Sequence, residues 1–339
     1  MSVVEHLYAD QFGSFIGKYS ERLKITQGKQ VLQQAPLLHL RSVTVANSGI
    51  GISSDAIAAC CERGIPIVML DGAGSVYASI YSSGLVGTVQ TRREQLLAFF
   101  DERRARLALA FSGAKVLNQA ATLLYWARNR REAHPDDAHW LTQAASDVRA
   151  WADQMLTLPW DDGLFERLMG CEGQAAHLYW QSARLLVPEG YGFSGRIGRG
   201  ATDPVNSLLN YGYGILYAEI ERAIILSGLD PYGGFLHADR PGKPSLVLDL
   251  IEEFRQIVVD RPVFGLVARG YGVAQEENGL LTLETRRDFA GKILKQLEGR
   301  VRYEGERPLL RHLIQRQARQ LATYVRGERD SYAAFVLED

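Results

Sequence analysis

The pattern of hydrophobic and polar positions changes once along the chain. In about the first 85 residues, apolar residues come in short runs rich in β-branched side chains, and Gly, Ser and Asn bound these runs. Two such runs, 37–53 and 64–70, predict strands. The segment 70–82 has the pattern of a strand, a tight glycine turn and a second strand. The N-terminal quarter is therefore predicted to be rich in β-structure.

One short helix is predicted within this region. A serine or aspartate at 53–55 can cap it, its body is the segment 56–63, and Gly64 ends it. The glycine-rich run 71–75 that follows has no Walker lysine and precedes a strand. A hairpin turn is therefore a better interpretation of that run than a phosphate-binding loop.

After about residue 90, apolar residues recur with helical spacing to the end of the chain. Asp203 followed by Pro204 is typical of a helix start, and Ser227 followed by Gly228 is typical of its end. In the helix expected over 92–131, a kink is expected at the Ser112-Gly113 pair. The predicted helices cover 92–131, 164–181, 204–227, 245–259, 285–299 and 308–326.

This order of elements predicts an α+β fold. A small β-rich N-terminal domain, residues 1–88, is expected to precede a larger all-helical domain, residues 89–339. No internal repeat or low-complexity linker interrupts the sequence.

The composition is that of an ordinary globular protein, with 339 residues, 46% of them apolar and 23% charged. Its apolar runs are shorter than the roughly 20 residues that a membrane span needs, and its N-terminus lacks the pattern of a secretory signal. We therefore expect a cytoplasmic protein with no membrane partner. The cysteines Cys60, Cys61 and Cys171 form no CxxC pair, so they predict neither a disulfide framework nor a zinc site.

The distribution of charge is more informative than its total. A formal net charge of −1 is a mild argument against a dedicated DNA-binding domain. Between Arg286 and Arg326, however, eleven Lys or Arg residues occur with only four Asp or Glu. Arg196 and Arg199 lie in a glycine-rich loop. Each basic group taken alone is ordinarily a solvated surface.

Glu172 interrupts the apolar stripe of its own predicted helix. At 100° per residue, the side chains within about 60° of it are all apolar or aromatic. They are Phe165, Leu168, Met169, Ala175, Ala176 and Tyr179. An ionised carboxylate there costs several kcal/mol unless it is paired, hydrogen-bonded or bound to a metal ion. The alternative to a metal is a buried ion pair with an Arg or Lys from another helix.

His237 precedes a helix that carries three acids, Asp249, Glu252 and Glu253. That helix alone is an ordinary amphipathic helix, with acids in its early turns. A histidine combined with carboxylates, and no thiolate, suits Mn²⁺ or Mg²⁺ better than zinc. One cation could therefore join Glu172, His237 and an acid of this helix. The rival group at 134–140 has two histidines and two aspartates, but its proline and acids are typical of a helix start.

Several stretches together resemble one known family. The sequence is similar to the CRISPR-associated protein one family, the integrase-endonucleases of spacer acquisition. The likeness covers essentially the whole chain, and the combination of stretches is more specific than any one of them. The matching stretches are 51–74, MGCEGQAAHLYW at 169–180, 203–224, GFLHADRPGKPSLVLDLIEEFR at 234–255, and VVDR at 258–261.

The resemblance implies a site and a reaction. Carried over by motif, the metal ligands are Glu172, His237 and Glu252, with Asp249 as a nearby supporting acid. Glu253 stands next to Glu252, so which acid of this helix contacts the metal stays open. With Mn²⁺ or Mg²⁺, a 3′-hydroxyl of captured DNA would attack a repeat-border phosphodiester in line.

The resemblance also implies partners. These are double-stranded DNA (prespacer and CRISPR repeat), a second copy of the chain bound through the N-terminal domains, and the small ferredoxin-like CRISPR-associated protein two. Arg196, Arg199, Asn206 and Asn210 are then candidate DNA contacts. Three alternatives stay open: a general metal-dependent nuclease of branched DNA in repair, a non-catalytic DNA-bridging scaffold, and an acid cluster that binds no metal.

Overall fold

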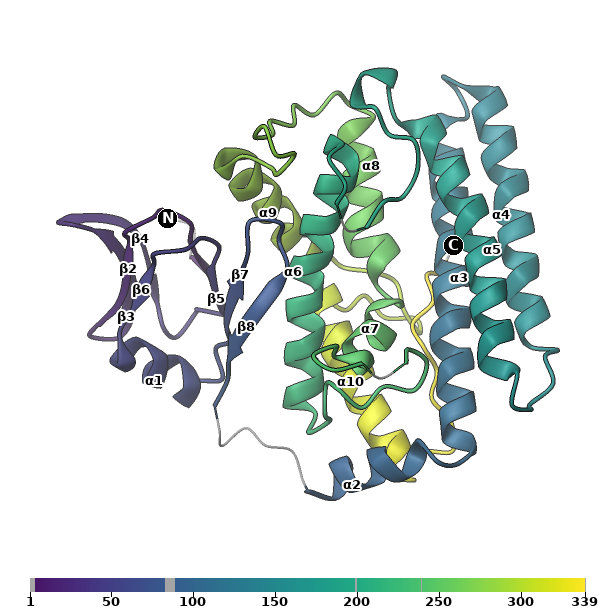
Figure 1. The fold of residues 1–339 in the computed structure, drawn as a ribbon, viewed down its shortest axis with the longest axis horizontal. Helices are drawn as coiled ribbons and strands as arrows, with labels where there is room; N and C mark the ends of the chain where they lie inside the picture. The colour runs from purple at the N-terminus through teal and green to yellow at the C-terminus, as the bar shows by residue number, and fades with distance from the viewer. Residues whose placement is uncertain (1–3, 83–88, 199, 239, 339) are drawn as a thin grey trace.

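The chain folds into two small sheets beside a larger group of helices (Figure 1). A computed structural model describes residues 4–82, 89–198, 200–238 and 240–338. The β-rich part comes first and the helices follow, so the predicted α+β class is confirmed. The helical part and the β part each have a hydrophobic core, and the helical core is much the larger.

The first sheet has the strand order β1-β5-β7-β8 and faces the helices. Its strands are His6–Ala9, Ser42–Val45, Ile67–Leu70 and Val76–Ile80. The first three pair in parallel, and β7 and β8 form the predicted hairpin. Its turn is held by Asp71, whose Oδ1 accepts from the backbone N–H groups of Ala73 and Ser75 at 2.9 and 2.8 Å. The glycine-rich run 71–75 is thus a turn, as the sequence predicts.

The second sheet has the order β4-β3-β2-β6 and lies farther from the helices. Its strands, in chain order, are β2 Phe15–Tyr19, β3 Arg22–Gln27, β4 Gln30–Pro36 and β6 Gly51–Ile52. Helix α1, Ser54–Glu62, begins after Ser53, whose side chain accepts from the backbone N–H of Ala56 at 3.2 Å. Gly64 follows its end with φ +65°, which confirms the predicted start and end.

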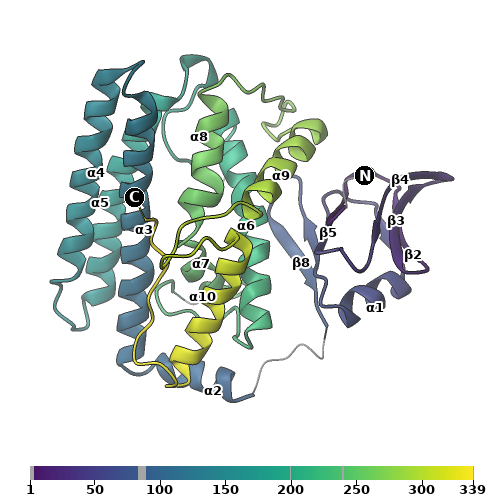
Figure 2. The ribbon, with the colours of Figure 1, turned by 180° about the vertical axis from the view of Figure 1, so that it is seen from behind.

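Nine α-helices of the described residues follow the strands. Seven of them overlap the six predicted ranges, and the helices at 135–155 and 261–267 lie outside those ranges. The nine helices are α2 Val89–Ala98, α3 Glu102–Arg130, α4 Pro135–Met155, α5 Leu164–Ala183, α6 Pro204–Leu226, α7 Ser245–Ile251, α8 Arg261–Val267, α9 Leu283–Leu297 and α10 Leu310–Val325. Helices α3, α4 and α5 lie side by side, and α6 lies between them and the first sheet (Figures 1 and 2).

Within the predicted ranges the structure differs from the prediction in four places. The helix expected over 92–131 is two helices, because Asp101 caps a new one by accepting from the N–H of Arg103 at 2.8 Å. Helix α3 runs unbroken through the Ser112-Gly113 pair. Helix α9 begins at Leu283, two residues before the predicted start at 285, because Thr282 is its cap. The helix expected over 245–259 ends at Ile251 and resumes as a π-helical segment, Gln256–Asp260.

Helix α3 is the one described helix that is long and apolar enough to cross a membrane, judged by length and composition alone. In its most apolar window, 67% of the residues are buried against the rest of the protein. This is the pattern of a core helix.

The first sheet and helix α6 approach each other closely. The hydroxyl groups of Tyr8 on β1 and Tyr211 on α6 are hydrogen-bonded. Asp10 receives two hydrogen bonds from Arg287 of α9, at 2.7 and 2.6 Å. The domain boundary expected between residues 88 and 89 stays a prediction, and residue 88 lies outside the described residues.

Replacing Gly214 by alanine is expected to destabilise this contact. A Cβ at Gly214 would lie 1.6 Å from the carbonyl oxygen of Gly74, so the hairpin and α6 would have to separate. We expect a loss of about 3 kcal/mol in the free energy of unfolding. Gly113→Ala is the matched control, because no atom lies within 4 Å of a Cβ there. In the middle of a helix it should gain roughly 0.5–1 kcal/mol. Denaturant unfolding measures both, and equal effects would contradict the prediction.

Candidate metal centre

The loop before α7 is organised by one buried carboxylate. Asp249 of α7 is fully buried, and its oxygens accept from the backbone N–H groups of Phe235, Leu236 and His237 at 2.6, 3.1 and 3.0 Å. The same carboxylate lies 2.7 Å from Nδ1 of His237. An ionised carboxylate only accepts hydrogen bonds, so Nδ1 carries the proton. The lone pair of His237 is therefore on Nε2, the form in which imidazole binds a metal.

Glu172 and Glu252 face a single ammonium group. Nζ of Lys115, on α3, lies 2.5 Å from Glu172 Oε1 and 3.0 Å from Glu252 Oε2. Glu172 comes from α5, and Glu252 directly follows α7, which lies beside α3 and α6 in Figure 1. The structure thus brings together two of the three predicted ligands. Glu172 also forms the ion pair that the sequence left open as an alternative to a metal, with a lysine from another helix.

Glu252 is the more deeply buried of the two acids. Its side chain is 2% exposed and that of Glu172 is 18% exposed. Burial opposes its ionisation, but Arg255 and Lys115 outweigh burial and lower the pKa of Glu252 below its usual range. Nη2 of Arg255 lies 3.4 Å from Glu252 Oε1.

The apolar stripe around Glu172 is less buried than the helical wheel suggests. Leu168, Ala175 and Tyr179 are buried, as expected, but Met169 is 60% exposed. Glu172 therefore lies at the edge of the stripe, where a side chain can reach both Lys115 and solvent.

Glu253 faces away from this centre. Its carboxylate accepts from the hydroxyl of Tyr332 at 2.5 Å, the backbone N–H of Phe335 at 2.7 Å and Nε2 of Gln317 at 3.0 Å. Burial raises its pKa to about 7. The three acids thus have different partners. Asp249 orients His237, Glu252 shares Lys115 with Glu172, and Glu253 binds the C-terminal segment.

Three of the four predicted DNA contacts form one cluster. Arg196 donates to Oδ1 of Asn206 at 3.1 Å and to Oδ1 of Asn210 at 2.7 Å. Asn206 is fully buried, and its amide also donates to Gly195 and Asp203, so it holds the loop on α6. Arg196 and Asn210 are half-buried. Arg199 lies outside the described residues, and a role of the other three in DNA binding stays a prediction.

A cavity of about 630 Å³ lies next to this cluster. Arg196, Asn210, Tyr213, Lys243 and Arg255 line it among other residues. Glu172 and Glu252 are not among the lining residues, but Arg255 on the cavity wall contacts Glu252. Its wall is cationic, as a site for phosphate groups requires.

Asp260 binds Tyr213, one of the residues that line the cavity. It is fully buried and accepts from the hydroxyl groups of Tyr179, at 2.8 Å, and Tyr213. Burial raises its pKa to about 6. The guanidinium of Arg255 lies 5.0 Å from the centre of the Tyr213 ring, a cation–π contact that fixes the arginine beside Glu252.

Lys115, Arg255 and Lys243 were not predicted as site residues from the sequence. One signal was available for Lys115, because this lysine stands in the long apolar run 107–127, as Glu172 stands in an apolar stripe. The rival group at 134–140 begins α4, and Asp137 pairs there with Arg130 at 2.8 Å.

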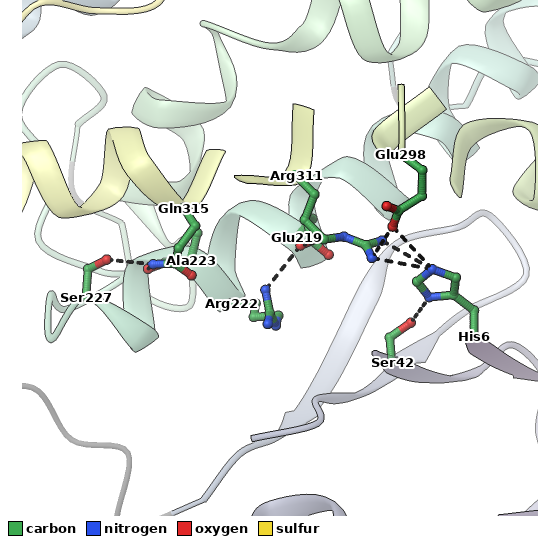
Figure 3. A network of polar contacts seen from close by, with 9 residues as sticks. All are labelled: His6, Ser42, Glu219, Arg222, Ala223, Ser227, Glu298, Arg311 and Gln315. Carbon is green, nitrogen blue, oxygen red and sulfur yellow. Dashed lines mark hydrogen bonds and ion pairs between the residues drawn. The ribbon is translucent and has the colours of Figure 1, made fainter. Parts of the chain in front are cut away.

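A second set of possible ligands lies at the edge of the first sheet. Single ligand atoms of Glu5, His6 and Glu298 all lie within 4.8 Å of one another. Arg311 of α10 occupies this position, as Figure 3 shows, with Nη1 2.5 Å from Glu298 Oε1 and 3.4 Å from His6 Nε2. Burial and the charge of Arg311 lower the pKa of His6 to about 3. This set joins β1 to the helices and is distinct from the predicted ligands.

Comparison with known proteins identifies the family. A family model described as CRISPR associated protein Cas1 matches residues 7–295. The chain belongs to the Cas1 family. A curated relative from Archaeoglobus fulgidus, named CRISPR-associated endonuclease Cas1 1, is 36% identical and is matched over 97% of this chain and 99% of its own length.

Solved structures agree with this Cas1 membership at the level of fold. A casposase bound to integration product has a TM-score of 0.80 at 24% identity, covering 99% of this chain and 95% of its own. A chain of a Cas6-RT-Cas1–Cas2 complex has a TM-score of 0.77 at 21% identity; the match covers all of this chain and 37% of that longer one. The fold expected of a Cas1 protein is therefore present from the first sheet to the last helices.

Proposed function

We propose that this Cas1-family chain is a metal-dependent DNA endonuclease and integrase that inserts new spacers into a CRISPR array. The observation that carries the proposal is the pair Glu172 and Glu252, which share one cation position at Nζ of Lys115. Asp249 separately orients His237 in the loop before α7. A curated relative named an endonuclease, and the fold shared with a casposase bound to integration product, favour this chemistry.

The donor set suits a hard divalent cation. Two carboxylates and one imidazole nitrogen match the ligands that Mn²⁺ and Mg²⁺ accept, and no cysteine is among the proposed ligands. Glu172, Glu252 and Nε2 of His237 would hold the ion, and Asp249 would fix the imidazole through Nδ1. When bound, such an ion supplies positive charge at the scissile phosphate and lowers the pKa of the attacking hydroxyl.

The other residues bind and orient the DNA. Arg255 and Lys243, on the cavity wall, would contact phosphate oxygens beside the reacting one. Arg196 and Asn210 would extend this contact along the DNA backbone. A 3′-hydroxyl held here would form a new bond to the phosphorus of the repeat border and release the 3′ oxygen of the cut strand. Water in place of that hydroxyl would give simple cleavage by the same residues.

The proposed partners follow from the same reaction. They are double-stranded DNA (prespacer and CRISPR repeat), a second copy of the chain bound through the β-rich part, and the small ferredoxin-like partner, CRISPR-associated protein two. A fold shared with one chain of a Cas6-RT-Cas1–Cas2 complex supports the last of these. A cytoplasmic location is part of the same proposal.

Strand transfer tests the proposal directly. A labelled duplex with a free 3′-hydroxyl is incubated with a repeat-bearing plasmid, the partner protein and Mn²⁺ or Mg²⁺. We expect joined product from the wild-type chain and none from His237→Ala or from reactions with chelator. Efficient cutting of branched DNA without the partner, and no joining with it, would instead favour a repair nuclease. Full activity of Glu172→Ala would favour a scaffold.

Asp249→Asn is expected to weaken metal binding about 10- to 100-fold. The amide oxygen can still accept from the N–H groups of Phe235 and Leu236. The NH2 group then faces His237, where it is a donor and no longer compels Nδ1 to carry the proton. Titration calorimetry with Mn²⁺ measures the effect. Ser245→Ala is a nearby control on the same helix, and a loss as large in that variant would contradict a specific role for Asp249.

A further inference from the structure

We propose that Lys115 is an internal counter-ion that holds the cation position between Glu172 and Glu252 in the metal-free protein and leaves it when a divalent ion binds. The inference rests on the proposed metal site, since it concerns the same two carboxylates. It adds a role for a lysine that no ligand motif contains.

The contacts of Lys115 are those of a bound cation. Its Nζ lies 2.5 Å from one carboxylate and 3.0 Å from the other, and its side chain is only 12% exposed. Two ionised acids that converge in a buried place repel each other unless a positive charge stands between them. Lys115 supplies that charge, and it lets the pair converge before any metal arrives.

The ammonium group and a divalent ion cannot share this position. Both would need the same oxygens of Glu172 and Glu252, and two cations in contact repel strongly where water is largely excluded. Metal binding therefore requires Lys115 to move. Its flexible four-carbon stem permits this, and the partly exposed Glu172 marks the side on which solvent is near.

Glu252 does not depend on Lys115 alone. Nη2 of Arg255 lies 3.4 Å from its other oxygen and stays beside it through the contact with the Tyr213 ring. After Lys115 leaves, Arg255 can still orient Glu252 toward the ion. The arrangement thus separates a fixed cation, Arg255, from an exchangeable one, Lys115.

Competition predicts that removing the lysine strengthens metal binding. In Lys115→Met we expect the Mn²⁺ dissociation constant of the full-length chain to fall about tenfold, because no ammonium has to be displaced. We also expect a lower melting temperature without metal, and a larger rise on adding Mn²⁺ than in the wild type. Calorimetric titration, electron paramagnetic resonance of free Mn²⁺ and thermal unfolding give these values without any activity assay.

Two control variants separate charge from bulk effects. Lys115→Arg keeps the positive charge and should not bind Mn²⁺ more tightly than the wild type. Lys292→Met removes a lysine that pairs with Asp288 on the exposed face of α9, at 3.3 Å, and should leave the dissociation constant unchanged. If Lys115→Met folds only with Mn²⁺ present, recovery of the folded state by Mn²⁺ supports the inference. Failure to fold in saturating Mn²⁺ overturns it.

The outcomes distinguish this inference from the metal site itself. If wild-type binding is lost in Glu172→Gln but Lys115→Met binds Mn²⁺ no more tightly than the wild type, the counter-ion role is wrong and the metal site stands. If the wild type binds no Mn²⁺, or if Glu172→Gln binds it equally well, both proposals are overturned.

Discussion

Replacing Glu252 by glutamine is expected to lower the rate of DNA strand transfer on the order of a thousandfold, since a bound metal contributes several kcal/mol of charge stabilisation. The fold should survive, because Lys115 keeps its contact with Glu172 and the amide fills the same space. Strand-transfer rates with Mn²⁺ and circular dichroism of the variant measure the two effects.

The neighbouring acid provides a matched control. Glu253→Gln should keep most of the activity, because its carboxylate contacts Tyr332, Phe335 and Gln317 and does not face Lys115. It should cost about 1–3 kcal/mol of stability, since one of three buried hydrogen bonds is lost or reversed. If Glu253→Gln were inactive and Glu252→Gln active, the assignment of the two acids would be wrong.

Replacing Phe335 by alanine is expected to cost about 3–5 kcal/mol in the free energy of unfolding. Phe335 is fully buried in the C-terminal segment, and its ring stacks on Phe254 with centroids 5.2 Å apart. Asn118 of α3 fastens the same segment, donating to the carbonyl of Phe335 at 3.0 Å and accepting from the N–H of Leu337 at 2.7 Å. Denaturant unfolding followed by fluorescence measures the loss.

A phenylalanine that is largely exposed serves as the comparison. Phe100 is 84% exposed, and Phe100→Ala should change the free energy of unfolding by less than about 0.5 kcal/mol. A similar small change for Phe335→Ala would show that the C-terminal segment adds little to the stability of the helical core. Phe335 stacks on Phe254, which follows Glu252 by two residues. The Mn²⁺ affinity of Phe335→Ala therefore tests whether this packing also positions Glu252.

Periodicity and capping residues located most of the fold. Ser53, Asp203 and the Ser227-Gly228 pair mark real helix ends, because each supplies a hydrogen bond or a backbone conformation that the helix terminus itself requires. Asp101 was missed because the apolar spacing continues on both sides of it. The interruption after Ile251 was missed for a similar reason: the residues up to Val259 keep an apolar pattern although the backbone changes to a π-helical segment.

The site was predictable only in part. Glu172 could be singled out because one helix is enough to show that its charge is misplaced. Lys115 lies 57 residues away, and pairing it with Glu172 requires knowing that α3 and α5 are neighbours. The choice between Glu252 and Glu253 depends on their tertiary contacts: Glu252 faces Lys115, and Glu253 faces the C-terminal segment. The C-terminal segment that receives Glu253 gives no periodic signal.

The short stretch from Phe235 to His237 has no regular secondary structure, yet a single carboxylate holds its three successive amides. Slow exchange with solvent deuterium is therefore a property that this irregular stretch shares with the helices around it. An amide-exchange measurement on the peptide that contains it would report whether the imidazole is already in position before either metal or DNA is added.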